Sequence, residues 1–194
     1  MLFPTCIHTT TDFSLDIIDD LKEKSLFVEK EYGSIRSNSL NVDSTHLTVA
    51  PFLQTIKPFD VLRDRINQKI LEFCQELGIE EKLHMNNMWF NISDKGDFNF
   101  PHSHPASVIS GVYYIESSGD SNLVFYNNTY LVNNFVCSVR EKENMYSYSD
   151  VSFPCQKGSL YLWPGHVIHG NPAQEKEGMK IALSFNTRLV TDGL

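Results

Sequence analysis

The stretch FPHSHPASVISGVYYIESS, from Phe100 to Ser118, combines a pair of histidines with a pattern typical of a β-strand. His102 and His104 stand two residues apart, and the run 108–115 after them is rich in β-branched and aromatic residues. Residues i and i+2 of a strand point to the same face. If the strand continues back through the histidines, both imidazoles can reach one divalent metal ion. An isolated H-x-H also occurs on solvated sheet edges, so a metal site needs a third ligand elsewhere.

Short runs of the same character fill the C-terminal half of the chain and are separated by Gly, Asn, Asp and Pro. The predicted strands are 87–93, 108–115, 122–126, 135–139, 159–163 and 180–189. Several short strands separated by turn signals favour an antiparallel sandwich or barrel.

The N-terminal half is helical in character. The spacing predicts a helix over 58–77, whose apolar residues recur at steps of three and four: Phe59, Leu62, Ile66, Ile70, Phe73 and Leu77. Pro58 suits its first turn and Gly78 the position just past its end. A strand over 2–8 and a helix over 13–22 are also expected. The predicted fold is therefore α+β, with helices packed on one side of a jelly-roll-like barrel.

Composition limits the class of protein. A chain of 194 residues that is 41% hydrophobic is most simply one domain, with a helical layer over about 1–85 and a barrel over about 86–189. No apolar run approaches the roughly 18 residues that cross a bilayer. The net charge is −8 and no dense lysine or arginine cluster occurs, so strong nucleic-acid binding is not expected. The start of the chain lacks a secretory signal pattern. The four scattered cysteines form no C-x-x-C pair, which favours reduced thiols and a cytoplasmic location.

A second group of candidate site residues lies near the C-terminus, in the segment WPGHVIHGNPAQEKEGMKIALSFN. Alternation would put His166 and His169 on opposite faces, so one of them should share the barrel interior. In the strand that follows, Lys180, Ala182 and Ser184 share one face. A cation on an otherwise polar inward face suits an anion anchor.

Taken in order, these motifs resemble the Fe(II)/2-oxoglutarate-dependent oxygenase superfamily. The order is H-x-H-P, S-G-V-Y-Y, G-x-L-x-x-W-P-x-x-x-x-H, and a basic residue leading into S-F-N. More narrowly, the chain resembles oxygenases of marine bacteria, cyanobacteria and their phages that are related to prolyl hydroxylases. The resemblance covers about residues 86–189 and implies a double-stranded β-helix fold, the cupin-like form of the jelly roll.

The resemblance also implies roles for individual residues. His102 and His169 match the two metal histidines, and His104 stands where most relatives carry Asp or Glu. Lys180 matches the basic residue that pairs with the far carboxylate of 2-oxoglutarate. Where a serine hydroxyl usually helps this anchor, the chain has Ala182, so Ser184 or a tyrosine is expected to replace it.

Two further residues are weaker candidates for cosubstrate binding. Tyr113 and Tyr114 face opposite sides of their strand, and we expect Tyr114 to face the cosubstrate. Asn91 alternates with apolar neighbours and is expected to face the pocket as well.

The implied activity is that of a dioxygenase, or hydroxylase. With Fe(II), 2-oxoglutarate and O₂, it hydroxylates an unactivated C–H bond and releases succinate and CO₂. A peptidyl substrate, prolyl by kinship, and a small-molecule substrate both stay open, as does assembly into a homodimer.

Three alternatives compete with this hypothesis. A cupin-type metalloenzyme fits the H-x-H pair and Gly158, but the cupin glutamate after the H-x-H is missing. A zinc hydrolase with three histidines and a bound water is a second alternative. Neither explains Lys180. A non-catalytic ligand-binding barrel is the third, favoured by the missing carboxylate at His104.

Overall fold

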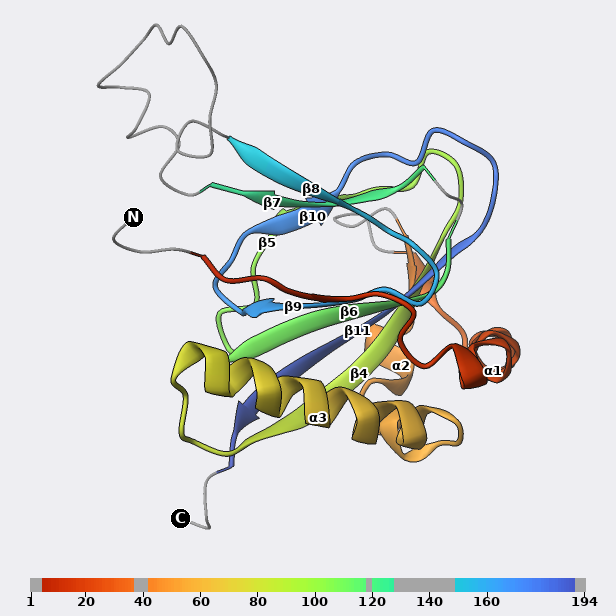
Figure 1. Ribbon diagram of the computed structural model, residues 1–194. Coiled ribbons are helices and arrows are strands. Elements are labelled where there is room, and N and C mark those ends of the chain that lie inside the picture. Colours follow the sequence, from red (N-terminus) through yellow and green to blue (C-terminus); the bar gives the residue numbers. More distant parts are fainter. Residues whose placement is uncertain (1–4, 37–41, 118–119, 128–148, 191–194) are drawn as a thin grey trace, which may run out of the picture.

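The computed structural model describes residues 5–36, 42–117, 120–127 and 149–190. Two antiparallel sheets face each other, and the long helices cover the outer face of the larger one (Figure 1). This arrangement is the double-stranded β-helix expected from the resemblance.

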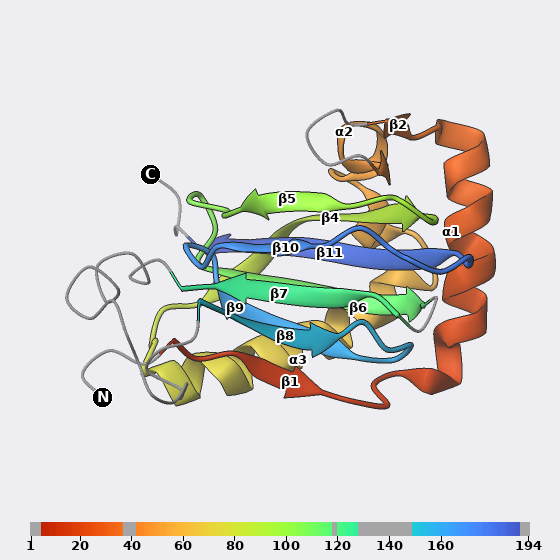
Figure 2. The ribbon, with the colours of Figure 1, turned by 90° about the horizontal axis from the view of Figure 1, so that it is seen from above.

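The elements follow one another in this order: β1 (His8–Thr10), η1 (Leu15–Ile17), α1 (Ile18–Tyr32), β2 (Ile35–Arg36), β3 (Asp43–Ser44), α2 (His46–Val49), η2 (Leu53–Thr55), α3 (Phe59–Leu77), β4 (Leu83–Ser93), β5 (Asn99–His102), β6 (Ile109–Glu116), β7 (Asn122–Tyr126), β8 (Asp150–Pro154), β9 (Leu160–Pro164), β10 (His169–Asn171) and β11 (Lys180–Leu189). The larger sheet has the order β1-β9-β6-β11-β4-β3-β2, and the smaller one β5-β10-β7-β8. Viewed from above, the smaller sheet lies across the larger one (Figure 2).

Alternation along the strands sorts side chains into two cores. Leu183 on β11 and Leu162 on β9 point toward the helices and pack against the apolar stripe of α3, which includes Leu62 and Ile66. The opposite faces of the same strands point between the sheets, where Ala182 packs in a second cluster. One face of each central strand therefore supports the fold, and the other is available for a site.

The structure corrects several predicted boundaries. The helix expected over 13–22 is the short η1 followed by α1, which continues to Tyr32. Of the strand expected over 2–8, residues 2–4 lie outside the described residues; the described strand is β1, which begins at His8 and pairs with β9. The strand expected over 135–139 lies outside the described residues. Strands β5, β8 and β10 are additional; β5 and β8 contain a proline and β10 a glycine, residues that are depleted in strands. The helix α3 begins and ends as expected, and Gly78 closes it in the left-handed conformation with φ 70°.

Candidate active site

Three histidines meet between the two sheets. His102 is the last residue of β5, His169 is the first of β10, and the two are paired across the strands. His104 lies beyond the end of β5, so the expectation that one strand carries both histidines is wrong. A loop contact places it instead: the His104 backbone N–H donates to the Gly165 carbonyl at 2.8 Å.

The imidazoles converge on one point. One ring nitrogen from each of His102, His104 and His169 lies within 4.8 Å of the other two. The Nδ1 atoms of His102 and His169 lie 2.8 Å and 3.0 Å from the carbonyls of Phe100 and Val167. A backbone carbonyl on Nδ1 leaves Nε2 free with its lone pair, as a metal ligand requires.

The electrostatics of the cluster favour the same form. Burial, aided by His102 and His46, lowers the pKa of His104 to about 4. Burial, followed by the effect of His102, lowers the pKa of His169 to about 3. Both imidazoles are therefore neutral at pH 7, which is the ligating state. Within the described part of the chain, no Asp or Glu joins this cluster.

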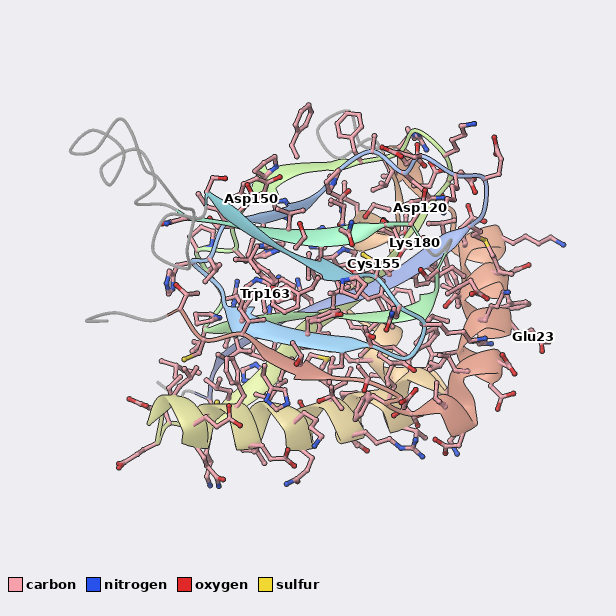
Figure 3. The ribbon with its side chains drawn as sticks, turned by 45° about the horizontal axis from the view of Figure 1, so that its top comes forward. Glu23, Asp120, Asp150, Cys155, Trp163 and Lys180 are labelled. Atoms are coloured by element: carbon pink, nitrogen blue, oxygen red, sulfur yellow. The ribbon has the colours of Figure 1, made fainter. Side chains whose placement is uncertain are left out.

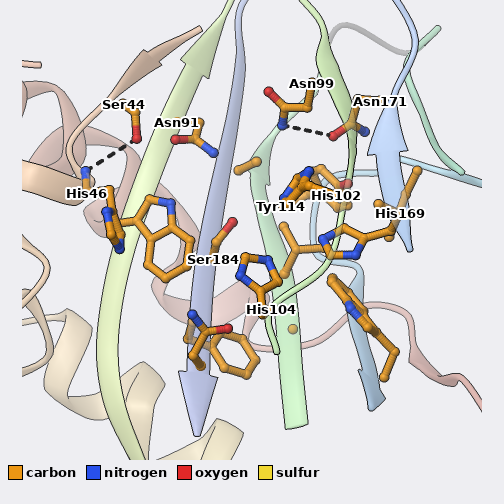
Figure 4. A pocket seen from close by; sticks show the side chains of 18 of the residues that line it. Ser44, His46, Asn91, Asn99, His102, His104, Tyr114, His169, Asn171 and Ser184 are labelled. Carbon is orange, nitrogen blue, oxygen red and sulfur yellow. Dashed lines mark hydrogen bonds between the residues drawn. The ribbon is translucent and has the colours of Figure 1, made fainter. Parts of the chain in front are cut away.

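A cavity of about 370 Å³ opens beside the triad (Figure 4). Its lining comes from both sheets and from α2: Ile35, Ser44, His46, Leu47, Trp89, Asn91, Asn99, His102, His104, Gly111, Val112, Tyr114, Leu123, Trp163, His169, Asn171, Ala182, Ser184, Phe185 and Asn186. A cavity with three convergent imidazoles and several uncharged polar side chains in its wall can hold a metal ion and a small chelating ligand.

The expected cosubstrate residues divide into two groups. Tyr114, Ser184 and Asn91 line the cavity. Lys180 is buried, at 3% exposure, but is not among the lining residues. Its Nζ donates instead to Ser121 Oγ at 2.7 Å.

Lys180 nevertheless lies close to the cavity wall. Figure 3 shows it beside Asp120 and Cys155, and Cys155 in turn accepts a hydrogen bond from Asn171, which lines the cavity. Burial lowers the pKa of Lys180, while Cys155, Asp120 and Asp97 act in the opposite direction. Cys155 and Asn171 thus connect the surroundings of Lys180 to the cavity wall.

Sequence reasoning missed part of the wall. No role was assigned to His46 from the sequence, yet it lines the cavity, with its ring 4.6 Å from that of Trp89. The helix that carries it, α2, has four residues, too few for a periodic signal. His166, by contrast, is exposed, as expected from its alternation with His169.

The chain matches the model of a protein family over residues 87–186, and that family is described as "Putative 2OG-Fe(II) oxygenase". The chain belongs to this family. It is therefore a 2-oxoglutarate-dependent oxygenase, whose cofactor is Fe(II) and whose cosubstrates are 2-oxoglutarate and O₂. This membership decides against the cupin, the zinc hydrolase and the non-catalytic barrel.

Solved structures share the fold of the oxygenase. A prolyl-4-hydroxylase from Pseudomonas putida superposes with a TM-score of 0.64 at 13% identity, covering 95% of this chain and 94% of that one. The viral collagen prolyl hydroxylase from Paramecium Bursaria Chlorella virus-1, in its 2-oxoglutarate complex, superposes with a TM-score of 0.61 at 16% identity, covering 95% of this chain and 96% of that one. HygX from Streptomyces hygroscopicus, with nickel and 2-oxoglutarate bound, superposes with a TM-score of 0.64 at 12% identity, covering 94% of this chain and 82% of that one.

No curated protein matches the oxygenase. Among the helices of the described residues, none has both the length and the apolar composition that a membrane crossing requires.

Proposed function

We propose that His102, His104 and His169 hold the Fe(II) of this oxygenase. The observation that carries the proposal is the convergence of three ring nitrogens within 4.8 Å. Burial lowers the pKa of two of these side chains, His104 and His169, and so keeps them neutral. A set of three imidazoles occupies half of an octahedral coordination sphere. It leaves the metal one positive charge richer than the two-histidine, one-carboxylate set usual for non-haem Fe(II) oxygenases.

The cosubstrate is assigned to the part of the cavity that Tyr114 and Ser184 line. Tyr114 and Ser184 offer hydroxyl donors to 2-oxoglutarate, and Lys180 offers a positive charge to its far carboxylate. Lysine carries its charge on a flexible four-carbon stem, so its ammonium can exchange Ser121 for a carboxylate. Asn91 was the fourth residue expected to bind the cosubstrate; its side-chain Oδ1 is buried and has no hydrogen-bond partner among the described residues.

When bound, Fe(II) with 2-oxoglutarate and O₂ supplies an oxidant for unactivated C–H bonds, with succinate and CO₂ as by-products. The residues of the chain orient the reactants and exclude water. Trp163 and Phe125 pack around His169, with ring centroids 4.5 Å and 6.2 Å from its ring, and so shield the triad on that side. The substrate is a peptidyl group, prolyl by likeness to the two prolyl hydroxylases, or a small molecule. A cytoplasmic location remains part of the proposal.

The test is an anaerobic titration of Fe(II)-loaded protein with 2-oxoglutarate, followed by the visible charge-transfer absorbance of the chelate. A saturable band is expected. The His169→Ala variant should bind no Fe(II), because only two of the three imidazole ligands remain to hold the metal. The Lys180→Met variant should keep its affinity for Fe(II) and lose about 10- to 100-fold in affinity for 2-oxoglutarate, since a charge-assisted hydrogen bond is lost. Unchanged metal affinity in the first variant, or unchanged cosubstrate affinity in the second, would refute the corresponding assignment.

A further inference from the structure

The cavity beside the triad has an uncharged wall. None of the described residues that line it is Asp, Glu, Lys or Arg. The lining residue His46 is neutral as well, because burial lowers its pKa below the ordinary value. In the proposed function, Fe(II) and Lys180 meet the charges of 2-oxoglutarate. A charged group of the substrate would lose its hydration and find no opposite charge in the wall, which is strongly unfavourable. The wall therefore selects against charge in the substrate that binds beside the cosubstrate.

The end of the cavity formed by α2 and β4 is apolar. The indole of Trp89 packs edge-on against His46, and its centroid lies 6.2 Å from that of His104. Leu47 and Ile35 line the same end and are 75% and 47% exposed, so they form a rim open to solvent. Figure 4 places His46 on the opposite side of His104 from His169. Across β4 and β11, Trp89 pairs with Ser184 and Asn91 with Ala182, whereas Lys180 pairs with Ser93. Trp89 is therefore farther along the strands from Lys180 than Asn91 is, and Asn91 lies between the two.

The charged side chains nearest to this rim are paired. Arg36 follows Ile35 in β2, and its guanidinium donates to the carboxylates of Asp43, at 3.3 Å, and Asp97. Asp97 is itself buried, at 5% exposure. These groups satisfy one another, so they offer no free partner for the carboxylate or ammonium of a free amino acid.

One polar atom at this end has an unmet requirement. Asn91 follows Trp89 by two residues in β4, lines the cavity and is 5% exposed. Its Oδ1 is buried and has no hydrogen-bond partner among the described residues. The atom is an acceptor, so its partner must carry an N–H or O–H. The dianion of 2-oxoglutarate has only acceptors, so the cosubstrate cannot be that partner.

We propose that the Trp89–Asn91 end of the cavity binds an uncharged, amide-bearing group: a residue within a peptide chain, not a free amino acid. A peptide N–H of the substrate donates to Asn91 Oδ1, and the apolar side chain packs on Trp89 beneath the rim of Leu47. This inference rests on the proposed function, since it names the substrate class of the same site. It also assigns Asn91 to the substrate instead of the cosubstrate.

The test compares matched pairs of probes on the Fe(II)–2-oxoglutarate complex under anaerobic conditions. N-acetyl-L-proline N-methylamide is paired with L-proline, and N-acetyl-L-leucine N-methylamide with L-leucine. Both tryptophans of the chain, Trp89 and Trp163, line the cavity, so intrinsic fluorescence reports its contents without turnover. Each capped probe should bind at least about 10-fold more tightly than its zwitterion, because only the zwitterion buries unpaired charges.

Variants at Asn91 separate the hydrogen bond from simple packing. The Asn91→Leu variant should bind the capped probes about 10-fold more weakly and keep its affinity for 2-oxoglutarate unchanged. Asn91→Asp keeps an acceptor and adds a negative charge, so it should improve binding of L-prolinamide, whose ammonium is free. Asn87→Leu is the matched control: Asn87 lies on β4 and also has a buried, unpartnered Oδ1, but it does not line the cavity.

Several results would overturn the inference. They are equal or tighter binding of the zwitterions, binding of neither capped probe, and equal losses in Asn91→Leu and Asn87→Leu. A loss of 2-oxoglutarate affinity in Asn91→Leu would return that residue to the cosubstrate. These outcomes are distinct from failure of the proposed function, in which no charge-transfer band forms whatever the probes do.

Discussion

Replacing Gly165 by alanine tests whether the loop contact, and not a strand, positions His104. A methyl group at Gly165 would lie 2.2 Å from the Ser107 carbonyl oxygen and 2.7 Å from that of His104, whereas ordinary contact begins at 3.4 Å. The atoms that crowd the methyl group are backbone atoms, which cannot turn aside as a side chain does. The segment from His104 to Ser107 must therefore move by 1.2 Å (3.4 − 2.2) or the turn must open.

A shift of that size exceeds the tolerance of metal coordination, which is about 0.2 Å. We expect Gly165→Ala to lower Fe(II) affinity by about 10- to 100-fold, as losses of supporting contacts around metal ligands do. Overpacking should also cost about 1–3 kcal/mol of folding free energy. Anaerobic equilibrium dialysis measures the iron affinity, and urea denaturation followed by circular dichroism measures the stability.

Gly111→Ala is the control for crowding alone. Its methyl group would lie 2.3 Å from Phe185 Cζ and 2.8 Å from Leu162 Cδ2, both of them side-chain atoms in the core. This variant should lose stability but keep its iron affinity. Folded Gly165→Ala protein with unchanged iron affinity would refute the role of the loop contact, and so would an equal loss of iron in Gly111→Ala.

Three further predictions concern stability. The pKa values of His104 and His169 lie near 4 and 3 in the folded state. The unfolded chain therefore binds protons first as the pH falls below about 6.5, and metal-free protein should lose up to about 1.4 kcal/mol per pH unit for each histidine, which urea titrations at pH 7 and 5 would detect. Ile66→Ala should cost about 2–5 kcal/mol in the same assay, because the side chain is fully buried. Ser121→Ala removes the 2.7 Å acceptor of Lys180 and should cost about 1–3 kcal/mol, a loss that added 2-oxoglutarate reduces in thermal melts.

Each of these predictions has a result that contradicts it. A flat pH dependence would mean that the two histidines are solvated in the folded state. A loss below about 1 kcal/mol in Ile66→Ala would mean that α3 does not pack on the sheet as described. If 2-oxoglutarate stabilises Ser121→Ala no more than the parent protein, Lys180 does not exchange its serine for the cosubstrate.

The sequence by itself determined the elements that carry a long periodic pattern. The apolar stripe of α3 repeats over five turns, and Ile181, Leu183 and Phe185 give β11 an apolar face by alternation, so hydrophobic periodicity alone indicated both elements. The alternation of β11 also put Ser184 on the face opposite Leu183 and Phe185, and Ser184 lines the cavity. Alternation put Tyr113 and Tyr114 on opposite faces of their strand but did not decide which of them faces the cavity; in the structure Tyr114 lines it. In the structure the Tyr113 hydroxyl donates to the Phe13 carbonyl, on the helical side.

Only the tertiary structure decided how the site is assembled. His104 owes its position to the turn at Gly165, more than sixty residues away, and His46 reaches the cavity from a helix of four residues. Lys180 hydrogen-bonds Ser121, the residue before β7, and no spacing along the strand of Lys180 reveals this contact. Periodicity reports which face of an element is buried. It does not report which loop lies against which, because such contacts join residues that are distant in sequence and depend on how the two sheets close.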